Sequence, residues 1–433
     1  MKRTETILRE IFASALKAAD PFKSVARETE RLRTMYGEGY SRLIVIGFGK
    51  AAVPMARAME EYLGDIIDSG VVITKYGHGE GHGLEKIRVL EAGHPVPDAN
   101  GMKGAAAVLE LAAVADEGTM AVVLISGGGS ALFASPANGV SLEDKQETTN
   151  LLLRAGADIG ELNSVRKHIS SVKGGRLAEI LHPAAVVSLI LSDVIGDRLD
   201  VIASGPTAPD TTTFGDALAT LDKYSLTGLS PKPVVKFLDQ GEKGRYPETP
   251  KEGDPVFKRV ENVIIGSNRL ALIAAREAAE ARGIGAEILS AELSGEAAEA
   301  GRWLAGKALA ARRKGGKRHP LCLISGGETT VTVTGAGKGG RNMELALAFA
   351  MEIEGTEGIT LLSAGTDGGD GPTDAAGAVV DWTTVGRARE MGIDPRRYLA
   401  ENDSYNFFRK SGGLLVTGPT GTNVMDIQIM VIR

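Results

Sequence analysis

Short runs of apolar residues recur along the chain, separated by segments with helical spacing. The runs are continuous rather than alternating, which is typical of strands buried on both faces of a sheet. They lie at 43–46, 71–74, 121–125, 186–191, 263–265, 321–324 and 359–362. Segments between them, such as 102–115 and 270–282, are rich in Ala, Leu and Glu with helical periodicity. Strands that alternate with helices predict an α/β protein with mostly parallel sheets.

A proline-rich segment interrupts this pattern. Five prolines stand among glycine, lysine and glutamate residues between Pro231 and Pro255, a composition typical of a linker or a long loop. We therefore expect an N-terminal domain over 1–235, a linker over 236–255 and a smaller C-terminal domain over 256–433. Near the N-terminus, apolar residues at helical spacing alternate with charged ones, which predicts a helix and not a signal peptide.

Composition narrows the class of protein. The chain is 43% apolar and 24% charged, as in ordinary globular proteins, and its net charge of −6 gives no reason to expect a nucleic acid or a membrane surface as partner. No apolar run approaches the ~18 residues of a membrane span, so a cytoplasmic enzyme is expected. The one cysteine, Cys322, lies in an apolar run and is expected to be buried. Glycine stands out, with 56 of 433 residues, nearly twice the usual share of about 7%.

The first glycine turn, GFGKAA at 47–52, directly follows an apolar run. It matches the G-x-G-x-x-A pattern of dinucleotide-binding turns. A nicotinamide site would also need an acid after the next strand, but Lys75 stands there. Lys50 would bring a positive charge to a helix start that already favours anions. The alternative is a solvated lysine at a helix end.

A second glycine turn, LISGGGSAL at 124–132, has an echo in LISGGETTV at 323–331. Consecutive glycines let backbone N–H groups form a concave anion nest, and serine hydroxyls can add hydrogen bonds to phosphate oxygens. The alternative is a tight turn without a ligand. No Walker A motif occurs. The candidate phosphate-binding residues are Ser126, Gly127, Gly128, Gly129, Ser130, Gly326 and Gly327.

Charged residues also follow the predicted strands. Asp193 comes after the run at 186–191, a usual place for a catalytic acid or base. Arg341 follows two glycines and could clamp a phosphoryl group, or lie on the surface. Asp367 and Asp370 stand in a glycine-rich loop that suits a hard cation or is a solvated acidic turn. The sequence has no helical histidine pair for zinc, and His94 is expected to be a structural loop residue, with a place in the site as the alternative.

Taken together, these motifs resemble the glycerate 2-kinase family, the glycerate kinases with a C-terminal MOFRL domain. The match extends over essentially the whole chain. Its most specific part is NSVRKHISSVKGGRLA at 163–178. The other motifs are VIGFGKAA at 45–52, GHPVPD at 93–98, LISGGGSAL at 124–132, LSDVIGD at 191–197, SGPT at 204–207, ISGGETTV at 324–331, GGRNMELAL at 339–347 and GTDGGDGPTDAAGA at 365–378.

The resemblance implies an enzyme that phosphorylates D-glycerate with ATP and a divalent cation such as Mg²⁺, giving 2-phosphoglycerate. It implies a Rossmann-like parallel-sheet N-terminal domain, a smaller α/β C-terminal domain and an active site in the cleft between them. Lys50 and Arg341 occupy the family's proposed catalytic positions. As a hypothesis, the turn at 126–130 holds ATP phosphates, and Asp367, Asp370 or Asp193 binds the metal. Asp193 would also accept the glycerate hydroxyl proton.

Two other functions remain open at this point. Members of the family have also been labelled hydroxypyruvate reductases, against which the missing ribose-binding acid argues. A non-catalytic sugar- or nucleotide-sensing module is the third option. The sequence leaves open the phosphorylated hydroxyl, the acceptor range, the preferred metal and the oligomeric state, with a homodimer among the options. Because Lys50 and Arg341 are expected to line an open cleft, their alanine variants are expected to fold normally.

Overall fold

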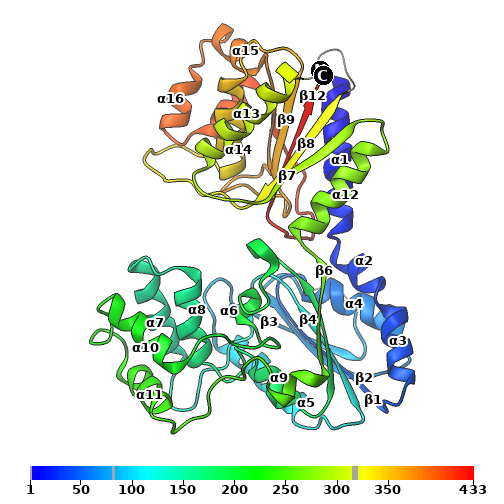
Figure 1. The fold of residues 1–433 in the computed structure, drawn as a ribbon, viewed down its shortest axis with the longest axis vertical. Helices are drawn as coiled ribbons and strands as arrows, with labels where there is room; N and C mark the ends of the chain where they lie inside the picture. Colours follow the sequence, from blue (N-terminus) through cyan, green and yellow to red (C-terminus); the bar gives the residue numbers. More distant parts are fainter. Residues whose placement is uncertain (1, 80–82, 315–319) are drawn as a thin grey trace. The chain divides into compact units, whose positions relative to one another are not determined.

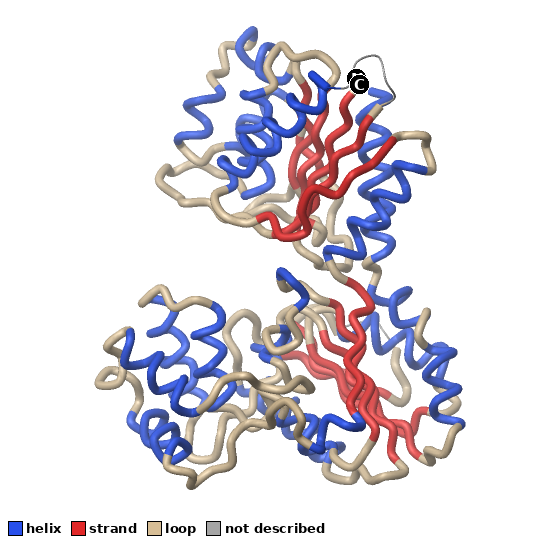
Figure 2. The backbone as a smooth tube through the Cα atoms, in the orientation of Figure 1, coloured by secondary structure: helices blue, strands red, loops and turns tan. Residues whose placement is uncertain are grey.

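The structure, a computed structural model, describes residues 2–79, 83–314 and 320–433, which form two compact units (Figure 1). We call Pro21–Ser192 with Asp197–Ile265 the N-terminal unit, and Met1–Asp20, Asp193–Gly196 and Gly266–Arg433 together the C-terminal unit. Each unit contains a six-stranded sheet with helices packed on it (Figure 2). The predicted α/β architecture is therefore confirmed.

The sheet of the N-terminal unit has the strand order β3-β2-β1-β4-β5-β6. The pairs β3–β2, β2–β1, β1–β4 and β4–β5 are parallel, and the order is that of doubly wound sheets of the Rossmann type. Five of these strands contain predicted apolar runs, whereas β3, with its mixed sequence IRVLEA, was not predicted. The strands are β1 (Arg42–Phe48), β2 (Ile67–Lys75), β3 (Ile87–Ala92), β4 (Thr119–Ile125), β5 (Ala185–Leu191) and β6 (Val260–Gly266).

Helices of the N-terminal unit cover the sheet and also form a separate group. Helices α7, α8, α10 and α11 lie together beside the sheet (Figure 1) and enclose a core that includes Val165, Phe214 and Leu238. The helices are α2 (Pro21–Ala26), α3 (Thr29–Gly37), α4 (Ala52–Leu63), α5 (Ala99–Ala112), α6 (Gly129–Leu132), α7 (Leu142–Arg154), α8 (Ile159–His168), α9 (Arg176–Leu181), α10 (Phe214–Lys223) and α11 (Lys232–Glu242), with short 3₁₀ turns η1 (Ile195–Asp197), η2 (Ile202–Ser204) and η3 (Pro255–Arg259).

The sheet of the C-terminal unit has the order β11-β10-β9-β12-β8-β7. Only the β7–β8 pair is parallel, and the other four pairs are antiparallel, so the prediction of mostly parallel sheets is wrong here. A continuous apolar run indicates burial on both faces and carries no information on strand direction. The strands are β7 (Gly285–Leu293), β8 (Leu321–Gly327), β9 (Ile359–Gly365), β10 (Gly377–Asp381), β11 (Leu414–Leu415) and β12 (Asp426–Ile432).

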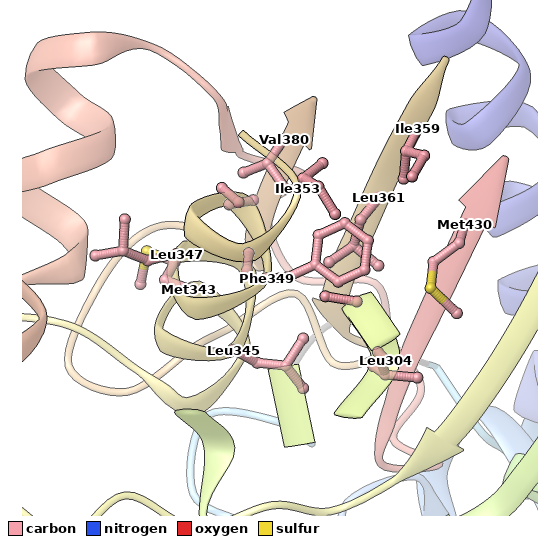
Figure 3. Close-up of a cluster of buried hydrophobic side chains, with 14 of the residues drawn as sticks. Leu304, Met343, Leu345, Leu347, Phe349, Ile353, Ile359, Leu361, Val380 and Met430 are labelled. Atoms are coloured by element: carbon pink, nitrogen blue, oxygen red, sulfur yellow. The ribbon is translucent and has the colours of Figure 1, made fainter. Parts of the chain in front are cut away.

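The core of the C-terminal unit surrounds α14, in which every residue from Asn342 to Ala350 is buried. Phe349 lies beside Leu361 of β9 (Figure 3), in a buried cluster that also includes Met343 and, from α13, Leu304. Cys322 is buried as expected, and burial raises the pKa of its thiol to about 12. The helices are α1 (Lys2–Ala18), α12 (Asn268–Glu280), α13 (Ala297–Lys314), α14 (Arg341–Glu352), α15 (Thr384–Glu390), α16 (Pro395–Ala400) and α17 (Ser404–Ser411). No helix in the described ranges has the length and apolar content to cross a membrane.

The division between the units differs from the expected one. The chain passes from one unit to the other at Ile265 and Gly266 rather than within 236–255, and α1 packs against α12 of the C-terminal unit. The proline-rich segment is packed: α11 buries Val234 and Leu238, and the Thr249 hydroxyl donates to Asp210 at 3.0 Å. Pro233 lies in the first turn of α11, where a proline is well tolerated.

Candidate active site

Two glycine turns meet at the carboxyl ends of β1 and β4, the neighbouring strands at which the sheet order reverses. Such a switch point is where doubly wound sheets bind ligands. Gly49 has a φ of +131°, and a Cβ placed on it would lie 2.5 Å from the carbonyl oxygen of Ser126. Only glycine permits this approach. The structure therefore brings the motifs at 47–52 and 126–130 together.

Hydrogen bonds hold the two turns in register. The Lys50 N–H donates to the Gly127 carbonyl at 2.9 Å, and the Ala51 N–H donates to the Ser126 hydroxyl at 3.1 Å, at the start of α4. Gly128 has a φ of +84°. Among the hydrogen bonds of the described residues, none uses the N–H of Gly127 or Gly128. The second turn thus presents backbone donors, while the Ser126 hydroxyl accepts from the N–H of Ala51, the residue before α4.

Two side chains pack over the second turn. A Cβ placed on Gly128 would lie 2.9 Å from Cδ2 of His94 and 3.4 Å from Cε of Lys50. Burial, together with the charges of Lys50 and Lys75, lowers the pKa of His94 to about 4. His94 is therefore neutral at pH 7. The sequence favoured a structural loop role for His94, whereas the structure places it against the candidate phosphate-binding turn.

Ser130 joins this turn to a group of basic side chains that the sequence analysis missed. The Arg166 guanidinium donates to the Ser130 hydroxyl at 2.6 Å, and the Lys173 ammonium donates to it at 2.9 Å. Both cations belong to the motif at 163–178, which supported the family resemblance but had no role assigned to it. A third cation, Lys145, is buried nearby on α7 and contributes to the local charge at Lys173.

In the C-terminal unit, Arg341 begins α14 and pairs with two carboxylates. Its Nε and Nη2 donate to Asp426 at 2.6 and 3.0 Å, and its Nη1 lies 2.6 Å from Glu328. These partners raise the pKa of the guanidinium despite partial burial. Asp426 is buried. From the sequence, Arg341→Ala was expected to fold normally. The pairing predicts the opposite, because Asp426 would lose its counter-charge.

Asp370 also has a structural task. Its two carboxylate oxygens accept from the backbone N–H groups of Asn342 and Met343 at 3.0 and 2.8 Å, at the start of α14. It is 2% exposed, and burial raises its pKa to about 7 against the effect of these bonds. This helix cap does not match the predicted metal-ligand role, since a hard-cation ligand offers its oxygens to the ion. Asp367, by contrast, is exposed.

Asp193 and Asp367 gather near Arg341 with acids that the sequence analysis did not select. Burial raises the pKa of Glu328, and three carboxylates raise it further: Asp426, Asp193 and Asp367. Glu328 directly follows the glycine pair of ISGGETTV, and this position after a predicted strand could have identified it as a candidate site residue. In the described part of the chain, no group of three or more His, Cys, Asp and Glu residues has an arrangement that could hold a metal ion.

Gly326 and Gly327 are not a turn. They are the last residues of β8 and pair with Ile427 and Asp426 of β12. A Cβ on Gly326 would collide with the side chain of Asn268. Unlike the turn at 126–130, these glycines therefore lie in a paired strand, where their small size serves close packing. Their phosphate-binding role stays a prediction. Beside them, a pocket of about 550 Å³ is lined by residues that include Glu328, Gly339 and Arg341.

The fold and these two clusters define an α/β protein with a candidate anion-binding turn at a Rossmann-type switch point and a separate arginine–carboxylate cluster. Two family models match the chain: Domain of unknown function (DUF4147) over residues 7–239, and the MOFRL family over residues 321–426. The chain belongs to the glycerate 2-kinase family with a C-terminal MOFRL domain.

Several relatives document this membership. A D-glycerate 2-kinase from Thermotoga maritima is 48% identical over 424 residues, which cover 98% of this chain and 97% of the relative. The crystal structure of a glycerate kinase from the same organism has a TM-score of 0.91 at 46% identity and covers 100% of both chains. A relative from Agrobacterium vitis, 43% identical over 430 residues that cover 98% of this chain and 94% of the relative, is provisionally named a hydroxypyruvate reductase.

Proposed function

We propose that this protein is a glycerate 2-kinase that transfers the terminal phosphoryl group of ATP to the 2-hydroxyl of D-glycerate. In this reaction the bond between the γ-phosphorus and the bridging oxygen breaks, a bond from phosphorus to the glycerate oxygen forms, and the hydroxyl proton is released. The observation that carries the proposal is the meeting of the two glycine turns beneath Lys50. The names of the relatives supply the acceptor and the class of reaction.

Binding of phosphate oxygens follows from the N–H groups of Gly127 and Gly128. Both donors face no acceptor among the described residues, and fixed backbone donors stabilise phosphate charge without reorganising. Lys50 is half-buried over the same turn. Its ammonium would neutralise charge on the transferring group. Because phosphoryl transfer needs positioning and charge neutralisation more than covalent chemistry, these groups suit the task.

The cluster around Arg341 supplies carboxylates. Mg²⁺ takes one or two protein carboxylates and otherwise binds water and substrate phosphates, so Asp367 with Asp193 or Glu328 fits that requirement, although the residues that the structure describes form no larger metal-binding group. When bound, the ion would neutralise phosphate charge. Arg341 acts as a positioning residue, because its hydrogen bonds hold Asp426 and Glu328 in place. We keep Asp193 as the proposed general base for the glycerate hydroxyl.

The alternative is a nicotinamide-dependent hydroxypyruvate reductase. One relative carries that provisional name, and the strand order suits a dinucleotide. However, β2 ends in Lys75, where a ribose-binding acid would be required, and Lys50 stands inside the glycine turn. Both lysines favour a highly charged phosphate ligand over a nicotinamide dinucleotide.

Parallel assays separate the proposed activities. The full chain is incubated with D-glycerate, ATP and Mg²⁺ while ADP release is followed, and with hydroxypyruvate and NADH while NADH oxidation is followed. We expect one ADP per 2-phosphoglycerate, with the phosphorylated position fixed by NMR of the product. NADH oxidation without ADP release would overturn the proposal in favour of the reductase. Tight ATP binding without turnover would overturn it in favour of a nucleotide-sensing module.

A further inference from the structure

Three basic side chains gather around Ser130 without a carboxylate. Arg166 and Lys173 both donate to the Ser130 hydroxyl, and Lys173 also donates to the Ser130 carbonyl at 2.8 Å. Lys145 is 3% exposed and Lys173 is fully buried. Among the described residues, none of the three forms a salt bridge. Burial lowers the pKa of both lysines, and the charge of Arg166 contributes to lowering each of them. Three basic groups thus lie inside the fold without a paired carboxylate among the described residues.

The neighbouring Lys167 shows that the fold can neutralise a buried lysine. Its ammonium lies 3.1 Å from Asp210 and 3.6 Å from Asp200. Lys167 directly follows Arg166 in α8, but the two side chains have different partners. The acidic partners of Lys167 are part of this protein. The described residues supply no acidic partner for Lys145, Arg166 and Lys173, which indicates that a ligand supplies the counter-charge.

Unused hydrogen-bond donors point to the same conclusion. The ammonium of Lys145 and the amide nitrogen of Asn163 are buried without a partner. Asn163 belongs to the group, because its Oδ1 accepts from Ser204 at 3.1 Å and the Ser204 hydroxyl lies 2.8 Å from that of Ser130. Buried polar groups rarely lack partners. Every unused group here is a donor, so the missing partner is an acceptor.

Charge makes that acceptor an anion. Burial lowers the pKa of Lys145 to about 7, and the charge of Arg166 adds to the effect. Burial, with the charges of Lys145 and Arg166, also lowers the pKa of Lys173. An anion among these groups would restore their charged forms and supply the missing counter-charge.

We propose that the Ser130 cluster, formed by Lys145, Arg166, Lys173, Ser130, Asn163 and Ser204, binds the carboxylate of glycerate. The inference rests on the proposed function and identifies how its acceptor is held. A small carboxylate suits a buried site better than a metal-bound triphosphate does, and the planar guanidinium of Arg166 matches a carboxylate. Ser130 also lies two residues after Gly128. A carboxylate held there would leave the adjacent 2-hydroxyl beside the turn under Lys50.

Lys145→Met tests the proposal because Lys145 has no hydrogen bond to lose and methionine keeps the apolar stem. We expect KM for D-glycerate to rise by about 10- to 100-fold, the value of a lost charge-assisted hydrogen bond, while KM for ATP and the melting temperature change little. Lys236→Met removes an exposed lysine of α11 in the same unit and is the matched control for loss of one positive charge. Arg166→Gln is measured in the same way in case the first variant does not fold.

A neutral analogue makes the readout specific for the carboxylate. Wild-type protein should bind D-glycerate at least tenfold more tightly than D-glyceramide in titration calorimetry, and Lys145→Met should largely abolish this preference. An unchanged KM for D-glycerate would overturn the inference. A rise in KM for ATP alone, with inorganic phosphate competing against ATP at the site, would also overturn it and assign the cluster to a phosphate. Failure of the wild-type protein to phosphorylate D-glycerate would instead overturn the proposed function, independently of what the titrations show.

Discussion

Replacing Arg341 by alanine should destabilise the C-terminal unit as well as impair activity. Asp426 is 1% exposed and receives two hydrogen bonds from the Arg341 side chain. Breaking a buried pair by removing one partner costs about 3–5 kcal/mol. Because the Arg341 side chain is 33% exposed, we take the lower end, about 3 kcal/mol, after discounting for solvent screening. For a unit of this size the melting temperature should fall by roughly 6–12 °C.

The protonation state of Asp426 provides a second test of the same idea. Burial already raises the pKa of Asp426, and Arg341 opposes that rise. Without Arg341 the folded-state pKa should rise further above its unfolded value, so the folded state binds the extra proton. The stability of Arg341→Ala relative to wild type should therefore improve as pH falls from 8 to 5 and worsen as pH rises.

Thermal melting followed by circular dichroism at several pH values measures both effects. The control is the double variant Arg341→Ala with Asp426→Asn, in which the unpaired charge is absent and at least half of the lost stability should return. The reasoning is refuted if Arg341→Ala melts at the wild-type temperature across this pH range. It is also refuted if the double variant is less stable than the single one, because the destabilisation would then not arise from the buried carboxylate.

Three further predictions concern the N-terminal unit. Lys50→Ala should fold normally and lower kcat by about 10³-fold, with a much smaller change in KM for ATP. Lys50→Arg should restore little of this activity, because the guanidinium would have to fit against His94 and Gly128. A near-wild-type kcat of Lys50→Ala in steady-state assays would remove Lys50 from the mechanism. Gly49→Ala should lower both the melting temperature and the activity, because its Cβ would collide with Ser126. The control is Gly253→Ala, which also has a positive φ but open space around it, so its stability should fall only by the backbone cost of about 1–3 kcal/mol. Equal losses of stability in the two variants would contradict the close contact at Gly49. KM for D-glycerate should rise as pH increases above about 7, because Lys145, which faces Arg166 and Lys173, is then deprotonated before the anion binds. If the Lys145→Met variant keeps this pH dependence, Lys145 does not bind the carboxylate.

The N-terminal sheet could be predicted because burial on both faces leaves continuous apolar runs in the sequence. The runs at 43–46, 71–74, 121–125 and 186–191 all lie within parallel strands. The same rule failed in the C-terminal unit. There the last strand, β12, inserts between β8 and β9, and pairing between segments this far apart in sequence depends on tertiary packing that an apolar run does not encode.

The boundary between the two compact units lies outside the predicted linker for a related reason. Prolines indicate where a chain cannot continue a regular element, but they do not indicate where it leaves a core. Pro233 lies in the first turn of α11, and the helix buries Val234 and Leu238. Likewise, the amphipathic pattern near the N-terminus predicted α1 correctly, yet only the structure could assign that helix to the C-terminal unit, against α12 and the sheet.

Backbone sites and side-chain sites differ in how visible they are in a sequence. The turn at 126–130 is contiguous, and its positive φ and close contacts require glycine, so the motif itself carries the signal. An acid in a glycine loop is ambiguous, because a carboxylate that caps a helix, as Asp370 does, has the same sequence context as one that binds a metal. Distinguishing the two requires knowing which N–H groups the loop approaches.

The Ser130 cluster shows most clearly which kind of site a sequence does not reveal. Its cations come from α7, α8 and the segment before α9, and no fixed spacing relates them. The sequence does not distinguish Lys167 from Lys145. Only the structure shows Asp210 beside Lys167, and no acid paired with Lys145 in the described part of the chain. The long motif at 163–178 was the most specific part of the family resemblance although it had no assigned chemistry. In that motif Arg166 and Lys173 donate to the Ser130 hydroxyl, and Asn163 is linked to it through Ser204. A requirement to hold these groups together, with no carboxylate paired to either cation among the described residues, gives that motif a physical reason.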